Sequence, residues 1–128
     1  MTIAEWMIFA AVLLYLLTIA PAKAFGYQTF DNNNPRDSAF YTPGIRARAL
    51  GAHLNGIEVF PFFATAVLLA EFRAAPQQWI DLLSVGFVAA RLGYVFLYLA
   101  DFATLRTLIW NVGFFLNVAI FFLPWWGR

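Results

Sequence analysis

The sequence predicts an all-α integral membrane protein, a four-helix bundle in which consecutive helices run up and down. Hydrophobic residues make up 62% of the 128 residues and charged residues only 12%, against about 25% charged in an ordinary soluble domain. A soluble fold of this size has too little interior for so much apolar surface, whereas a lipid bilayer is itself an apolar solvent. Four long apolar runs, separated by polar or Pro-containing links, give the number of helices.

Each apolar run is long enough to cross a membrane, which takes about 20 residues at ~1.5 Å per residue. The runs cover residues 4–22, 44–73, 77–100 and 104–126. Together they predict a single four-span membrane domain over residues 1–128. The first run begins with Glu5 rather than with basic residues, so we expect a retained span and not a signal peptide.

The links between the runs predict how the helices are arranged. The first link, FGYQTFDNNNPRDSAFYTPG, is rich in Asn, Asp and Pro and is expected to form a solvated loop. The other two are short. Pro76 suits the first turn of the third helix, and Thr104 is a candidate N-cap for the fourth. Short links place consecutive helices side by side and antiparallel.

Basic residues predict which loops face the cytoplasm, because cytoplasmic loops are enriched in Lys and Arg. The basic residues around the first and third loops are Lys23, Arg36, Arg46, Arg48 and Arg106, and those on the other side are Arg73 and Arg128. We therefore expect the first and third loops in the cytoplasm. The net charge of +1 gives no broad basic field, so no nucleic acid partner is expected.

Polar residues form a stripe on the second predicted helix and another on the third. Residues three or four apart share one side of a helix. The stripes consist of Arg48, Gly51, Asn55 and Glu58 on the second helix and of Arg91, Tyr94, Tyr98 and Asp101 on the third. We expect the two helices to face each other through these stripes. Glu58 and Arg91 then lie at similar depth, which predicts an ion pair, because a lone charge at the bilayer centre costs ~2.5 kcal/mol or more.

Two interpretations are open for most of these residues. Ionisable residues inside a membrane mark functional sites, but Glu58, Arg91 and Asn55 could also only hold helices together. His53 is a candidate ligand or acid–base residue, or a packing residue. The chain has one His and no Cys, so no metal site is expected. The plain alternatives for the other residues are packing for Tyr94 and Tyr98, anchoring for Arg46 and Arg48, interhelical hydrogen bonds for Asn111 and Asn117, and an Asp101 ion pair for Arg106.

The pattern resembles the MAPEG family, the membrane-associated proteins in eicosanoid and glutathione metabolism. From Arg48 to Phe63 the sequence reads R-x(4)-H-x-N-x-x-E-x-x-P-x-F, and ARLGYVFLYLADFATLRTLIW follows downstream. The chain also has the family's four spans in about 130 residues, so the resemblance covers nearly the whole chain. The sequence is most similar to small bacterial members. It implies a homotrimer, expected in a bacterial inner membrane, with glutathione bound between neighbouring subunits near the cytoplasmic face.

The resemblance also implies roles for particular residues. Arg106 matches an arginine proposed to stabilise the glutathione thiolate, a role that suits a permanently charged guanidinium. The residues expected to bind glutathione are Arg48, Asn55, Glu58, Arg91, Tyr94 and Tyr98 by position, together with the candidate His53. The implied activity is that of a membrane-bound transferase or peroxidase, which uses glutathione on lipophilic electrophiles or lipid peroxides.

The sequence departs from this pattern at one position of the stripe. Gly51 stands where glutathione-using members commonly have an Arg. The missing Arg removes a charge-assisted contact, and such hydrogen bonds contribute ~1.5 to 3 kcal/mol. A second interpretation is therefore open, a non-catalytic trimeric membrane protein whose polar layer binds a lipid head group or a small anion.

Overall fold

The computed structural model describes residues 1–126, and all regular structure in that range is helical. The helices are α1 (Ile3–Leu17), α2 (Ala20–Ala24), α3 (Ile45–Phe72), α4 (Gln77–Leu99) and α5 (Ala103–Trp126). Four stretches are long and apolar enough to cross a membrane, namely Ile3–Ala24, Ile45–Phe72, Gln77–Leu99 and Ala103–Trp126. The prediction of an all-α chain with four membrane-spanning helices is confirmed.

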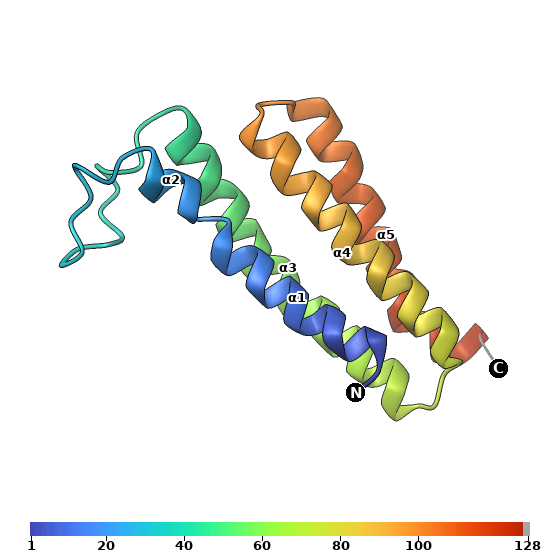
Figure 1. Ribbon diagram of the computed structural model, residues 1–128. Helices are drawn as coiled ribbons and strands as arrows, with labels where there is room; N and C mark the ends of the chain where they lie inside the picture. Colours follow the sequence, from blue (N-terminus) through green and yellow to red (C-terminus); the bar gives the residue numbers. More distant parts are fainter. Residues whose placement is uncertain (127–128) are drawn as a thin grey trace.

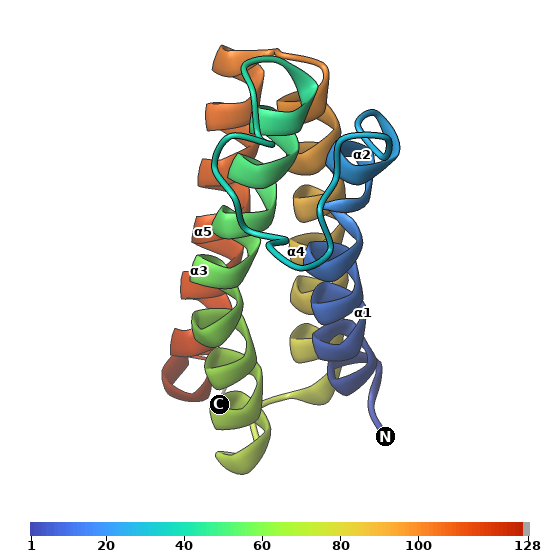
Figure 2. The ribbon, with the colours of Figure 1, turned by 90° about the vertical axis from the view of Figure 1, so that its left-hand side faces the viewer.

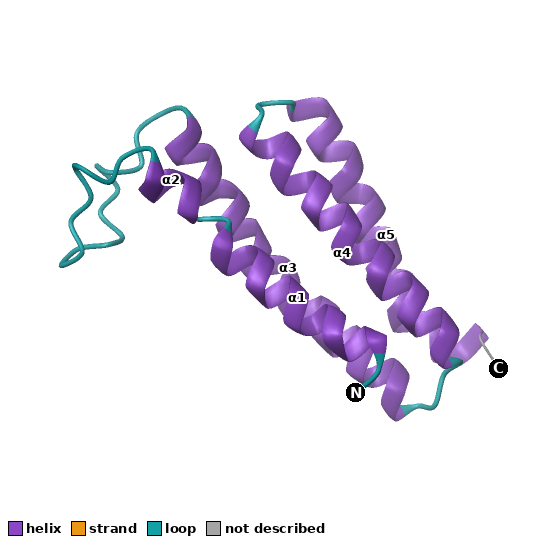
Figure 3. Ribbon diagram, viewed as in Figure 1, coloured by secondary structure: helices purple, strands orange, loops and turns teal. Residues whose placement is uncertain are grey.

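Consecutive long helices run in opposite directions (Figure 1). α1 lies along α3, and α4 lies along α5. In the view turned by 90°, α3 lies beside α5 and α1 lies beside α4 (Figure 2). The two termini and the α3–α4 link lie at one end of the molecule. The long loop after α2 and the short α4–α5 turn lie at the other end (Figure 3). This arrangement puts the end of α2 and the beginning of α3 on the same side as the start of α5, and the loop between them folds back along the bundle (Figure 2).

The first span is interrupted, whereas the sequence predicts a continuous helix over residues 4–22. α1 begins with a capping box, in which the Thr2 side chain accepts from the Glu5 backbone N–H and the Glu5 side chain accepts from that of Thr2. It ends at Leu17, and the Thr18 hydroxyl donates to the Leu14 carbonyl at 2.6 Å. Pro21 has no N–H to continue the ladder, so the chain restarts as the short helix α2.

The two short links turn through left-handed backbone conformations. Ala74 has φ +53° in the α3–α4 link, and Asp101 has φ +66° in the α4–α5 turn. Pro76 is the N-cap of α4. α5 begins at Ala103, and the Arg106 N–H donates to the Phe102 carbonyl at 2.9 Å. The prediction that Thr104 caps this helix is therefore wrong, because Thr104 already lies in the first turn.

The apolar core lies in the half of the bundle nearer the termini. At its centre the rings of Phe63 and Phe87 stack with their centroids 4.1 Å apart. Ile80, Val67 and Ile120 are fully buried around them. The stripe residues Arg48, Asn55, Tyr94 and Tyr98 lie in the other half, where a smaller apolar cluster of Ala22, Phe40 and Ala49 packs between α2, the long loop and α3.

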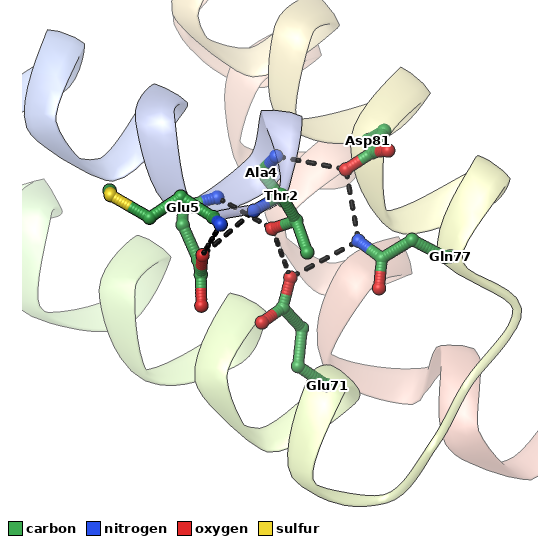
Figure 4. A network of polar contacts seen from close by, with 7 residues as sticks. Thr2, Ala4, Glu5, Glu71, Gln77 and Asp81 are labelled. Carbon is green, nitrogen blue, oxygen red and sulfur yellow. Dashed lines mark hydrogen bonds and ion pairs between the residues drawn. The ribbon is translucent and has the colours of Figure 1, made fainter.

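A network of polar contacts joins the start of α1 to the α3–α4 link (Figure 4). The Thr2 hydroxyl donates to Glu71 Oε1 at 2.6 Å, and the Ala4 N–H donates to Asp81 Oδ1 at 2.8 Å. The Gln77 amide donates to both carboxylates, at 3.1 and 3.0 Å. Three helices are therefore held together at the end of the molecule opposite the polar stripes.

Candidate functional site

The polar stripes of α3 and α4 face each other, as the sequence predicts. Arg48 Nε donates to the Leu99 carbonyl at 3.1 Å. This side chain therefore provides a hydrogen-bond donor for a carbonyl at the C-terminal end of α4. One turn further along α3, a Cβ atom on Gly51 would collide with the Tyr98 hydroxyl. The absence of a side chain at Gly51 therefore makes room for Tyr98. The tyrosine occupies the space in which the resemblance predicts the start of an arginine side chain.

Deeper in the bundle, α3, α4 and α5 line a partly open cavity of ≈ 240 Å³, which we call the inner cavity. Its polar lining consists of Asn55, Glu58, Arg91 and Asn117, and its apolar lining consists of Val59, Phe62, Phe87, Trp110, Gly113 and Phe114. The Arg91 side chain is buried, whereas Glu58 is exposed on the surface of the single subunit. A negative and a positive group thus share one largely aromatic cavity.

Glu58 and Arg91 line this cavity without forming an ion pair, so the predicted pair is wrong. Within residues 1–126 the one ion pair joins the N-terminal amine to Glu5, at 3.8 Å. The Arg91 guanidinium instead lies over the ring of Tyr94, with 4.2 Å between the guanidinium carbon and the ring centroid. A cation–π contact of this kind positions the guanidinium without neutralising it. Both charges therefore remain available to a ligand.

A second cavity, of ≈ 230 Å³, lies at the end of the bundle where α4 turns into α5; we call it the outer cavity. It is lined by Asn55, Tyr94, Tyr98, Arg106, Thr107 and Trp110. Asn55 and Trp110 line both cavities, so the two adjoin. Glu58 and Arg91 therefore lie next to a space that reaches the helix end.

Arg106 is held in the outer cavity by aromatic contact rather than by an acid. Its guanidinium carbon lies 4.2 Å from the centroid of the Tyr98 ring, and Tyr98 meets Tyr94 edge to face at 5.6 Å. The alternative ion pair with Asp101 is absent from the described part of the chain. The guanidinium charge is thus uncompensated and faces a cavity, which is an arrangement suited to an anion.

Three buried polar atoms at this site lack a hydrogen-bond partner within residues 1–126, namely Asn55 Oδ1 and both amide atoms of Asn117. Ser84 Oγ also lacks a partner in that range, but Ser84 lines neither cavity. Sequence reasoning treated Asn111 and Asn117 as interhelical hydrogen-bonding residues, but Asn111 Nδ2 donates within its own helix, to the Thr107 carbonyl at 2.8 Å. The spacing of Trp110, Gly113 and Asn117 on one side of α5 is the signal that could have placed Asn117 at the site.

His53 lies on the other side of α3, away from both cavities. Its Nδ1 is 2.7 Å from the Tyr15 carbonyl of α1. It lines a separate, open hollow of ≈ 560 Å³ beneath the long loop, together with residues that include Lys23 and Arg36. Of the residues predicted to bind glutathione, the structure brings together Asn55, Glu58, Arg91, Tyr94 and Tyr98, and it adds Arg106. Arg48 lies nearby but lines neither cavity.

Comparison with known proteins gives one match. The model of the MAPEG family matches residues 3–126, which is nearly the whole chain. No curated protein and no solved structure matches the sequence.

Proposed function

The chain belongs to the MAPEG family, and its four membrane-spanning helices make it an integral membrane protein. We propose that it is a glutathione-dependent transferase or peroxidase. Its substrates are lipophilic electrophiles or lipid peroxides that reach the site from the bilayer. The long loop and the α4–α5 turn face the cytoplasm of a bacterial cell, from which glutathione arrives. The observation that carries this proposal is a pair of adjoining cavities, one lined by charges of both signs and one lined by an arginine, none of which forms an ion pair within residues 1–126.

The inner cavity suits the γ-glutamyl end of glutathione. That end is an α-amino acid group and carries an ammonium and a carboxylate. Glu58 and Arg91 line one cavity without pairing with each other, so the ammonium can pair with Glu58 and the carboxylate with Arg91. Charges inside a membrane are stable when they are paired. Asn55 Oδ1, which has no donor among residues 1–126, can accept a further hydrogen bond from the peptide.

The outer cavity suits the cysteinyl thiol. A thiol attacks an electrophile as its thiolate, and a nearby cation lowers the thiol pKa by favouring the charged form. Arg106 supplies that cation, and its place in the first turn of α5 adds the partial positive charge of a helix N-terminus. Arginine does not act as a base, so the thiol proton passes to water. The thiolate sulfur then bonds to the electrophilic carbon as the leaving group departs with its electron pair.

The test is the near-ultraviolet absorbance of the bound thiolate. We expect saturating glutathione to produce this band with the purified protein in detergent, and Arg106→Leu to abolish it. Arg36→Leu is the control, since Arg36 is an exposed arginine of the long loop that lines neither cavity. A wild-type protein without the band at saturating glutathione would overturn the proposal. A band that Arg106→Leu leaves undiminished would remove Arg106 from this role.

A further inference from the structure

The inner cavity contains a polar residue that the proposed function does not yet use, Asn117 of α5. Asn117 is 1% exposed and lines the cavity. It lies eleven residues after Arg106, which corresponds to roughly 16 Å along the helix axis at ~1.5 Å per residue. It is thus the polar residue of α5 at the deep end of the cavity, far from the cytoplasmic end.

Neither amide atom of Asn117 has a hydrogen-bond partner within residues 1–126. Inside a bilayer, bulk water does not satisfy such groups, so a buried amide without partners is unfavourable. The cavity beside it has a volume of ≈ 240 Å³, many times the ~10–15 Å³ that a cavity needs in order to hold one water. The space therefore admits a polar group much larger than a single water.

The free atoms of Asn117 define what that group must offer. Nδ2 needs an acceptor and Oδ1 needs a donor, and a carboxylate with a neighbouring ammonium provides both. Glu58 and Arg91 present the complementary charges to the same cavity. An α-amino acid group is the smallest common chemical unit that satisfies all three side chains together.

We infer that Asn117 is a specificity-determining residue, which recognises the α-amino acid group of the γ-glutamyl end of the thiol; this inference rests on the proposed function. Its Nδ2 donates to the ligand carboxylate and its Oδ1 accepts from the ligand ammonium. Glu58 and Arg91 provide the opposite charges that pair with the ligand, and Asn117 selects for a group that carries both an ammonium and a carboxylate. A thiol without a γ-glutamyl residue leaves the amide unpaired, and sites built to hydrogen-bond a group reject analogues that lack it.

Two residues of the chain serve as matched controls. Ser84 is also buried with an unpartnered oxygen, but it does not line the inner cavity. Asn111 is an asparagine of the same helix whose amide is already bonded to Thr107. Ser84→Ala therefore removes an unpartnered polar atom outside the cavity, and Asn111→Leu makes the same chemical change as Asn117→Leu without touching the cavity.

The experiment measures dissociation constants for two ligands on the full-length protein in detergent. The first is γ-Glu-Ala-Gly, a glutathione analogue without the thiol, and the second is the dipeptide Cys-Gly, which lacks the γ-glutamyl residue. For Asn117→Leu we expect the Kd of γ-Glu-Ala-Gly to rise by about tenfold to a hundredfold, the range for lost hydrogen bonds to charged groups. The Kd of Cys-Gly should stay unchanged, and both controls should keep both wild-type values.

The outcomes separate this inference from the proposed function. If γ-Glu-Ala-Gly binds Asn117→Leu as tightly as it binds the wild type, the inference is wrong and the proposed function stands. Equal weakening of both ligands would also overturn it, because a merely structural residue does not discriminate between them. If the wild type binds neither ligand nor glutathione, both proposals fall. Should Asn117→Leu not assemble, Asn117→Ser, which keeps a smaller polar group, replaces it. The same test then applies: the Kd of γ-Glu-Ala-Gly should rise relative to the Kd of Cys-Gly.

Discussion

Gly51 is the residue at which close packing and the expected chemistry compete. The Tyr98 hydroxyl lies where a Cβ atom of residue 51 would be. Any side chain at this position must therefore move Tyr98, and with it the ring on which the Arg106 guanidinium rests. The glycine at residue 51 thus lets the Tyr98 side chain pack closely between α3 and α4.

We predict that Gly51→Ala destabilises the protein by about 1 to 3 kcal/mol, the range for overpacked sites. Thermal unfolding in detergent measures the change. Gly93→Ala is the control, because a Cβ there makes only an ordinary contact, 3.6 Å from Ile109, and Ala is favoured over Gly in a helix by ~0.5 to 1 kcal/mol. Tyr98→Phe removes the nearest atom, so it should restore part of the loss in the double variant. A Gly51→Ala protein as stable as Gly93→Ala would contradict the close packing of Tyr98 against Gly51.

Glu58→Gln gives the second prediction at this scale. Breaking a buried ion pair costs about 3 to 5 kcal/mol, but Glu58 has no ion-pair partner within residues 1–126. We therefore expect the melting temperature of Glu58→Gln to change little, while its Kd for glutathione rises by about tenfold or more, since an ammonium loses its counter-charge. A large loss of stability without any loss of binding would restore the ion pair that the sequence predicts.

The positions of the stripe residues on α3 and α4 follow from the sequence, but their side-chain conformations do not. A helical wheel gives the angle and depth of a residue, so it correctly predicts that the stripes of α3 and α4 meet. It does not give the rotamer, and Arg91 turns to the Tyr94 ring rather than to Glu58. The sequence predicts only interhelical hydrogen bonds for Asn117, because the apolar residues of α5 do not indicate which of its sides faces the inner cavity.

At the scale of helices, the polar network at the terminal end holds α1 in place. Asp81 accepts from the first turn of α1, at the Ala4 N–H, and also from Gln77. Helix termini leave N–H groups without intrahelical partners, so the carboxylate satisfies a group that would otherwise lack one. The capping box satisfies others at the same terminus, so the start of α1 is fixed from two directions.

We predict that Asp81→Ala destabilises the protein by about 1 to 3 kcal/mol, the cost of leaving a buried donor unsatisfied. Hydrogen exchange should become faster at the first turn of α1 and stay unchanged in the middle of α5. Gln78→Ala is the control, because Gln78 is an exposed neighbour on α4. Unchanged exchange at α1 in Asp81→Ala would show that the network does not hold the helix.

The bounds of the long helices can largely be predicted from the sequence. Three of the four predicted spans agree with α3, α4 and α5 to within one residue at each end, because Pro, Gly and polar residues mark those ends sharply. The break between α1 and α2 does not follow from hydropathy, since the residues on both sides of it are apolar. It depends on the local hydrogen bond from Thr18 to Leu14 and on Pro21.

At the scale of the whole molecule, the single subunit leaves polar groups on a surface that faces lipid. Glu58 is exposed at a position about 20 Å into α3, counted at ~1.5 Å per residue from its first residue. A carboxylate at that depth is unfavourable in hydrocarbon, and such residues face a bundle interior or a subunit boundary. Because the chain belongs to the MAPEG family, we propose that it forms a homotrimer, in which a neighbouring subunit would cover this surface.

We therefore predict that the purified protein is a trimer and that glutathione binding depends on it. Native mass spectrometry from detergent should show three copies, and chemical cross-linking in membranes should give a ladder that ends at three. Glu58 lies at the proposed subunit boundary, so diluting the detergent-solubilised protein until it dissociates should weaken glutathione binding in parallel with the loss of trimer. A monomer that binds glutathione with undiminished affinity would mean that one subunit holds the complete site. The exposed carboxylate would then need some other cover, such as water that enters through the adjoining outer cavity.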